Sequence, residues 1–144
     1  MPWYGNASLG LISTTAARRV DWTTDTIKVG LTSSTYVPNQ DTHDFYDDIT
    51  NELATATGYT AGGVTLGTKS TVYDSGTNTT RLIAASASWT FSASKTMRIA
   101  FIYKDTGSAA TSPLLGYVDF GTDQTTSGVF TINWDATDGV LRMV

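Results

Sequence analysis

The run of residues 95–104 constrains the fold more than any other stretch of the chain. Every second residue from Met97 to Tyr103 is large and apolar. Successive residues of a strand point to opposite faces of a sheet, so this pattern predicts a strand with one apolar face. The other face carries two apolar residues between two cations, which predicts an interior strand that is buried on one side and partly covered on the other. We expect its neighbours to be antiparallel.

Several other runs alternate or are rich in β-branched and aromatic residues. Threonine is the commonest residue and only 15% of the residues are charged, so the chain takes its polarity from hydroxyl groups that suit strands and turns. We therefore predict an all-β fold, an antiparallel β-sandwich or jelly-roll-like domain. The predicted strands are 26–32, 64–73, 81–85, 87–91, 95–104, 114–120, 129–135 and 140–144, with turns at 74–78, 92–94 and 121–128.

The inward-facing residues of these runs predict one hydrophobic core. With 144 residues and no cysteine, the chain is expected to form a single domain, 1–144, that is held together by packing rather than by disulfides. No apolar run reaches the ~20 residues that a membrane helix needs, so we expect no membrane span. The predicted core is Ile27, Val29, Leu31, Trp89, Phe91, Ile99, Phe101, Phe130, Ile132 and Trp134.

The N-terminal segment differs from the strands. Residues 1–7 lack periodicity and contain Trp3 and Tyr4, which indicates an extended arm. Residues 8–20 predict a short helix: Ser8 is an acceptable N-cap, and the face of Leu9, Ile12, Ala16 and Val20 is apolar. The alternative is that 8–20 continues the arm.

Residues 33–63 form a long irregular excursion, and such an insertion in a compact domain is usually functional. A helical turn or two is expected at 44–53, where apolar residues recur every four positions. Its acidic group beside His43 includes weak candidates for a Ca²⁺ site, but the spacing lacks the EF-hand alternation. We favour the interpretation in which these aspartates cap backbone amides, and we expect no metal or cofactor. The weak candidates are Asp41, Asp44, Asp47 and Asp48.

The titratable residues predict a protein that is not an enzyme. His43 is the only histidine, which leaves few general-base arrangements, and the net charge of -4 argues against nucleic acid as a partner. The strand-end acids Asp105, Asp119, Asp123 and Asp135 could pair as in a glycosidase, although turn formation explains each of them. The alternative from another class is therefore a carbohydrate-binding or carbohydrate-cleaving module that uses Trp89 or Trp134.

Four stretches carry a resemblance to a known group of proteins. They are DTIKVGLTSS at 25–34 with PNQDTHD at 38–44, TGYTAGG at 57–63, YKDTG at 103–107 with PLLGYVDF at 113–120, and INWD at 132–135. As a set they resemble small virion-associated proteins of tailed bacteriophages, over most of the chain after residue 8. The resemblance implies a structural role on the virion, first of all as a capsid decoration (cement) protein. A tail or tail-fibre associated protein is the alternative, and the family offers no catalytic residues.

A decoration protein made in the host cytoplasm would bind the major capsid protein on the capsid surface. Because the shell repeats, we expect a small cyclic homo-oligomer, a trimer before a monomer. Aromatic residues outside regular strands are the expected contacts, and deleting residues 1–7 should weaken attachment without changing the melting of the domain. The alternative is that the arm folds back on its own domain. The expected interface residues are Trp3, Tyr4, Tyr36, Phe45, Tyr46 and Tyr59.

Overall fold

The computed structural model describes residues 1–12 and 16–144 of the chain. Strands dominate, they pair antiparallel, and the only α-helix among the described residues is short, which confirms the predicted all-β class. The elements in chain order are α1 (Ala7–Ile12), β1 (Ile27–Thr32), the 3₁₀ turn η1 (Tyr46–Asp48), β2 (Val64–Thr65), β3 (Ser70–Asp74), β4 (Thr79–Ile83), β5 (Ala87–Lys104), η2 (Ala109–Thr111), β6 (Leu114–Ile132) and β7 (Leu141–Met143).

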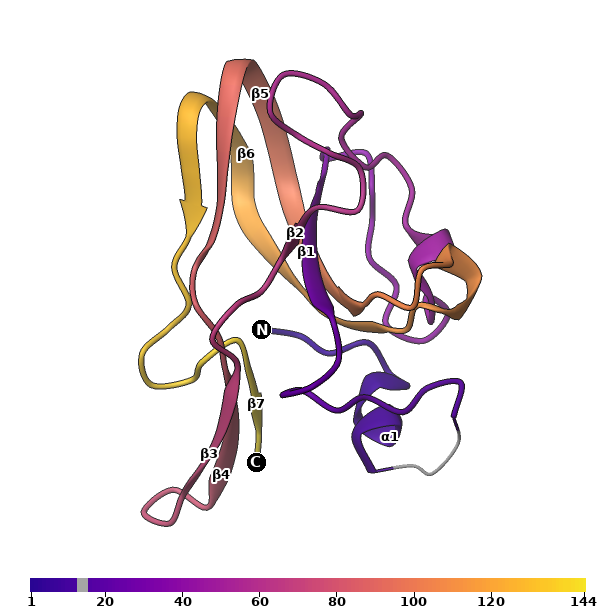
Figure 1. The fold of residues 1–144 in the computed structure, drawn as a ribbon, viewed down its shortest axis with the longest axis vertical. Coiled ribbons are helices and arrows are strands. Elements are labelled where there is room, and N and C mark those ends of the chain that lie inside the picture. The colour runs from indigo at the N-terminus through magenta and orange to yellow at the C-terminus, as the bar shows by residue number, and fades with distance from the viewer. Residues whose placement is uncertain (13–15) are drawn as a thin grey trace.

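The strands form two sheets that pack together as a sandwich. The larger sheet has the order β2-β1-β5-β6 and the smaller one the order β3-β4-β7. Figure 1 shows β5 and β6 arching over the upper part of the molecule, while the β3–β4 hairpin and β7 lie below. The predicted strand 64–73 is wrong as one element, because β2 belongs to the larger sheet and β3 to the smaller one.

Strands β5 and β6 form one long two-stranded ribbon, although the sequence predicted that turns would divide each of them into two strands. Residues 92–94 lie opposite a single residue of β6, because Phe91 pairs with Gly128 and Lys95 with Thr126. The predicted turn at 92–94 is therefore a bulge. The turn predicted at 121–128 is also strand, with Gly121 and Gly128 at positive φ, 79° and 90°, where the register shifts. Bulges bend a strand without ending its pairing, so the ribbon arches.

The core lies on both faces of β5. Eight of the ten predicted core residues are buried, whereas Phe130 and Trp134 are only partly buried. The ring of Tyr46 stacks on Phe101 and Tyr103, so the excursion covers one face of the strand. On the other face, Gly116 pairs with Ile102 and approaches Leu141 of the smaller sheet. On this second face Ala100 and Ile102 are buried while Arg98 and Lys104 stay partly exposed, so it is partly covered, as predicted.

The N-terminal helix is shorter than predicted. Helix α1 ends at Ile12, residues 13–15 of the predicted helix lie outside the described residues, and 16–18 form a turn. The predicted apolar face is wrong: Leu9 is 53% exposed and Ile12 80% exposed, while Ala7 and Gly10 are buried. The chain crosses directly above Gly10, whose carbonyl accepts from the N–H of Val20 at 3.1 Å.

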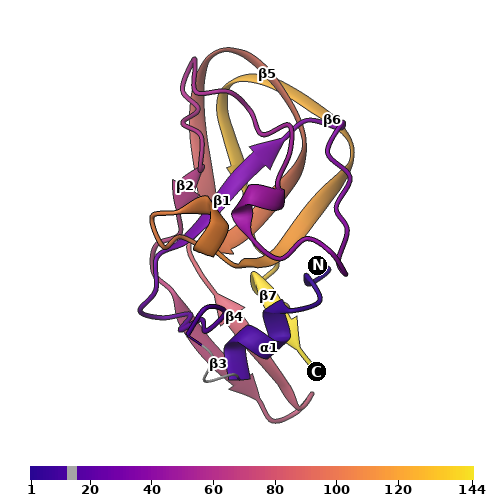
Figure 2. The same cartoon turned by 90° about the vertical axis from the view of Figure 1, so that its right-hand side faces the viewer.

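The predicted arm is an ordered part of the domain. The N–H of Tyr4 donates to Leu115 O at 3.1 Å, and the N–H of Tyr117 donates to Pro2 O at 3.2 Å. The arm therefore pairs with the start of β6 and covers that part of its edge. Figure 2 shows α1, which follows the arm, lying over the smaller sheet beside β4.

Candidate functional site

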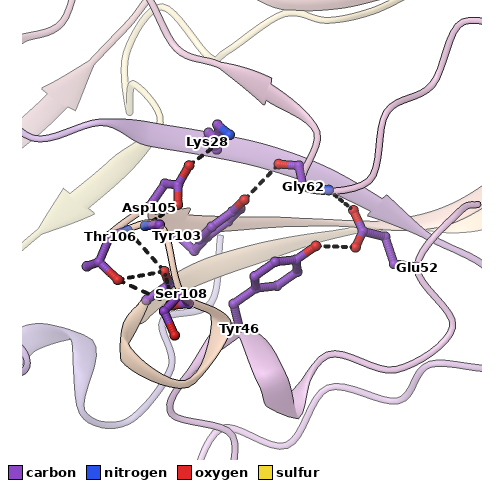
Figure 3. A network of polar contacts seen from close by, with 10 residues as sticks. Lys28, Tyr46, Glu52, Gly62, Tyr103, Asp105, Thr106 and Ser108 are labelled. Carbon is purple, nitrogen blue, oxygen red and sulfur yellow. Dashed lines mark hydrogen bonds and ion pairs between the residues drawn. The ribbon is translucent and has the colours of Figure 1, made fainter. Parts of the chain in front are cut away.

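The excursion is anchored by one carboxylate. Glu52 accepts from the hydroxyl groups of Tyr46 at 2.5 Å and Tyr59 at 2.6 Å, and from the N–H of Gly62 at 2.6 Å. Figure 3 shows Tyr46 and Gly62 converging on this side chain. Glu52 is positioned by β1, because the flanking Leu53 N–H donates to Leu31 O at 2.9 Å. The carboxylate thus joins three distant points of the excursion.

The glycine-rich segment 57–63 seats this anchor against the larger sheet. Gly63 has φ +74°, and a Cβ there would lie 1.8 Å from Val29 O, so only glycine fits. The Tyr59 hydroxyl also accepts from the N–H of Leu31 at 2.9 Å. Burial, followed by the effects of Glu52, raises the pKa of Tyr59 far above its usual value, so this phenol stays neutral as a structural group.

Two aspartates of the acidic group, Asp44 and Asp48, form contacts within the fold, whereas Asp41 and Asp47 are exposed. Asp44 accepts from Arg18 at 2.9 Å and from Asn6 at 2.5 Å, and the Arg18 hydrogen bond is the main cause of its lowered pKa. Asp48 caps η1 by accepting from the N–H groups of Asp44 and Phe45. The Asp48 contacts fit the capping interpretation, whereas Asp44 bonds to two side chains instead of backbone amides. Within residues 1–12 and 16–144, no group of three acidic or imidazole side chains could hold a metal ion.

The histidine and the strand-end acids are likewise held by neighbours. His43 Nδ1 lies 2.9 Å from the Tyr36 hydroxyl, which is itself 2.8 Å from the Tyr4 hydroxyl. Asp105 pairs with Lys28 at 2.8 Å and Asp119 with Arg98 at 2.5 Å. In each aspartate the cation is the main cause of a lowered pKa. Neither carboxylate therefore has the raised pKa of a general acid.

The six expected interface residues divide into two groups. Tyr4, Tyr36 and Tyr59 are buried in the domain's own core, so the premise that they lie outside the packed domain is wrong for them. Burial is the main cause that raises the pKa of Tyr36 to about 12. Sequence periodicity missed these contacts because each tyrosine packs against residues far away in the chain. The other three, Trp3, Phe45 and Tyr46, are partly buried.

The exposed apolar side chains point instead to a groove between α1 and the smaller sheet, which we call the α1 groove. It is an open depression with a volume of about 430 Å³. Tyr73, Thr80 and Met143 pair directly across β3, β4 and β7, so they form a row on one face of that sheet. Thr80 and Met143 line the groove together with Leu11, Ile12, Arg19, Val20, Asp21, Trp22, Thr23, Thr71 and Leu82. The sequence did not predict this surface, because the apolar residues of the helix were expected to face the core.

A second hollow lies where the end of β6 meets β7 and the arm. This space of about 350 Å³ has Trp3 and Trp134 in its lining, together with Asp135, Asp138 and Arg142. We call it the tryptophan cleft. Its two indoles come from the arm and from the segment after β6, which the fold brings together although they are far apart in the chain.

No protein-family model, no characterised protein and no solved structure matches this chain. No helix of residues 1–12 and 16–144 is long and apolar enough to cross a membrane. The functional conclusion therefore rests on the contacts and surfaces above and on the resemblance carried by the sequence.

Proposed function

We propose that this chain is a non-enzymatic structural protein of a tailed-phage virion, which decorates the capsid by binding the major capsid protein. The resemblance over four stretches of the sequence supports the phage assignment. The polar groups of the excursion support a structural role, because Glu52, Asp44 and Asp48 all hold backbone or side chains of the same chain. Attachment of the same protein to the tail is the alternative.

The α1 groove is the observation that carries the proposal. Ile12, which lines the groove, is 80% exposed; Leu9 of α1 is 53% exposed and Tyr73 of β3 is 63% exposed, and both lie outside the lining. Burying a side chain of this size stabilises a complex by about 1.5–3 kcal/mol, and contiguous exposed apolar surface marks interaction sites. We infer that the groove receives an apolar segment of the capsid shell. This moves the attachment surface from the arm, whose Tyr4 is buried, to α1 and the smaller sheet.

A repeating shell favours copies arranged about its local symmetry axes, so the proposal keeps a trimer on the capsid as the first choice and a monomer as the second. Sedimentation equilibrium of the free protein and cryo-electron microscopy of decorated capsids measure the two states separately.

Co-sedimentation with capsids assembled from the major capsid protein of the same genome tests the function. The unmodified chain should bind, and Ile12→Asp should weaken binding by at least about tenfold, because the charge would lose hydration in the groove. Val129→Asp is the matched control, since Val129 is 68% exposed on β6 and lies outside the groove lining. Failure of the unmodified chain to bind would refute capsid decoration. Equal binding by both variants would refute only the groove.

A further inference from the structure

The tryptophan cleft has the features of a preformed small-molecule site. Its volume of about 350 Å³ lies at the lower end of the usual range for ligand pockets, about 300–1,000 Å³. Both indoles are partly buried, so part of each ring remains available to a ligand. The cleft is lined by the arm, by β6 and the turn after it, and by β7.

The two indole rings are fixed in place before any ligand binds. Trp3 Nε1–H donates to Arg142 O at 3.1 Å, and Trp134 Nε1–H donates to Ala85 O at 2.9 Å. Because each N–H is already bonded to the backbone, the rings are oriented and offer apolar faces rather than donors. Preorganised aromatic surface binds ligands with little loss of side-chain entropy.

The polar side chains of the cleft combine acceptors and donors, with the carboxylates of Asp135 and Asp138 beside the guanidinium of Arg142. Asp138 Oδ1 accepts from Arg142 Nη1 at 2.7 Å, so this carboxylate already has a cationic partner. Asp135 Oδ1 accepts from the N–H groups of Thr137 and Asp138, which lowers its pKa and keeps it ionised. The second oxygens of both carboxylates and the remaining guanidinium N–H groups of Arg142 are suited to hydroxyl groups, which donate and accept at once.

We propose that the tryptophan cleft binds a neutral pyranose sugar, with the apolar C–H face of the ring against an indole and its hydroxyl groups on Asp135, Asp138 and Arg142. A cationic side chain fits less well, because Asp138 already pairs with Arg142, and the same guanidinium would repel a cation that approached Asp135. The site is separate from the α1 groove: the two linings share no residue. Sugar binding thus does not depend on the proposed capsid attachment. It keeps Trp134 and Asp135 of the sequence-based alternative but not Trp89, which is buried.

A glycan array followed by calorimetric titration tests the proposal with the full chain. The probes are glucose, galactose, N-acetylglucosamine and the β1,4-linked di- and trisaccharides of glucose and N-acetylglucosamine. At least one should bind, and Trp134→Ala should weaken its affinity by about tenfold, the effect of losing one good stacking contact. Tyr73→Ala is the matched control: it removes an exposed aromatic residue outside the cleft and should change affinity less than twofold.

Asp138→Asn keeps the size of the side chain and is the test variant if Trp134→Ala does not fold. It should weaken sugar binding measurably with the melting temperature preserved. Binding of no sugar by the unmodified chain, or equal loss in Tyr73→Ala and Trp134→Ala, overturns the proposal. Preferential binding of lysine methyl ester over every sugar also overturns it and assigns the cleft to cations. Capsid co-sedimentation of Trp134→Ala should stay unchanged, which separates this outcome from that of the α1 groove.

Discussion

The hydroxyl group of Tyr59 lies 2.6 Å from Glu52 Oε1 and also accepts a hydrogen bond from the N–H of Leu31. One phenol therefore joins the excursion to the most buried strand of the larger sheet. Tyr59→Phe should destabilise the domain by about 1–3 kcal/mol, because it leaves a buried N–H without its acceptor. Urea unfolding measures this. Tyr73→Phe, at an exposed hydroxyl on β3, should stay within about 0.5 kcal/mol. Equal stability of both variants would show that Tyr59 is not an anchor.

Alanine substitutions at Gly63 and Gly107 distinguish the cost of a steric clash from the cost of backbone strain. Both have positive φ, +74° and +87°, but a Cβ at Gly63 would meet Val29 O, whereas nothing lies within 4 Å of one at Gly107. Gly107→Ala should cost about 1 kcal/mol from strain alone, and Gly63→Ala substantially more. Thermal melts of the two variants make the comparison. A Gly63→Ala protein as stable as Gly107→Ala would mean that the segment 57–63 does not sit on β1.

Deletion of residues 1–7 should lower the melting temperature, contrary to the expectation from sequence. Tyr4 is 1% exposed, its ring lies 5.4 Å from that of Tyr117, and its hydroxyl pairs with Tyr36. Removing it empties a core site, at a cost of about 3 kcal/mol. Calorimetry should show a clear loss for Tyr4→Ala and a larger one for the truncated chain, which also loses the backbone hydrogen bonds between the arm and β6, while Leu9→Ala at an exposed position should show little. An unchanged melting curve after truncation would restore the view of the segment as a free arm.

Stability should fall in acid. Arg18 lowers the folded-state pKa of Asp44, Lys28 that of Asp105 and Arg98 that of Asp119. A depressed carboxyl pKa stabilises the folded state above the unfolded value of about 3.9, and this contribution is lost as the pH falls through the folded-state pKa. The free energy of unfolding should therefore decrease below about pH 4. Asp44→Asn should flatten that decrease, because it removes one of the three depressed carboxyl groups. Urea titrations from about pH 7 to about pH 3 provide the measurement.

The sequence predicted best what depends on local alternation. The inward positions of β1 and β5 follow from period two, and the structure buries Ile27, Val29 and Leu31 as expected. Alternation does not distinguish a bulge from a turn, because both are rich in small polar residues. Residues 92–94 and 121–128 were therefore predicted to be turns between separate strands.

The candidate sites were less predictable because they depend on contacts between distant segments. Tyr59 is paired with Leu31, and Trp3 with Arg142, through bonds that no local pattern encodes. The sequence did hold a signal for Tyr59. It lies in a glycine-rich segment near the single glutamate of the chain, and such a segment suggests close contact with another stretch of backbone. The sequence held no such signal for the apolar residues of α1. A leucine or isoleucine in the sequence looks the same whether the fold buries it or leaves it exposed.

The long β5–β6 ribbon also predicts the order in which parts of the chain fold. Its strands are neighbours joined by a short connection, so the ribbon closes small loops as it forms. Strand β1 is separated from β5 in the chain by the excursion, β2 and the β3–β4 hairpin. The ribbon should thus belong to the folding nucleus, and the excursion should dock late. Tyr59→Phe would then accelerate unfolding and leave refolding nearly unchanged in stopped-flow measurements, while a refolding rate that drops with stability would place docking before the barrier. A late-docking excursion is the part of this β domain that opens first and most often, without loss of the ribbon beneath it.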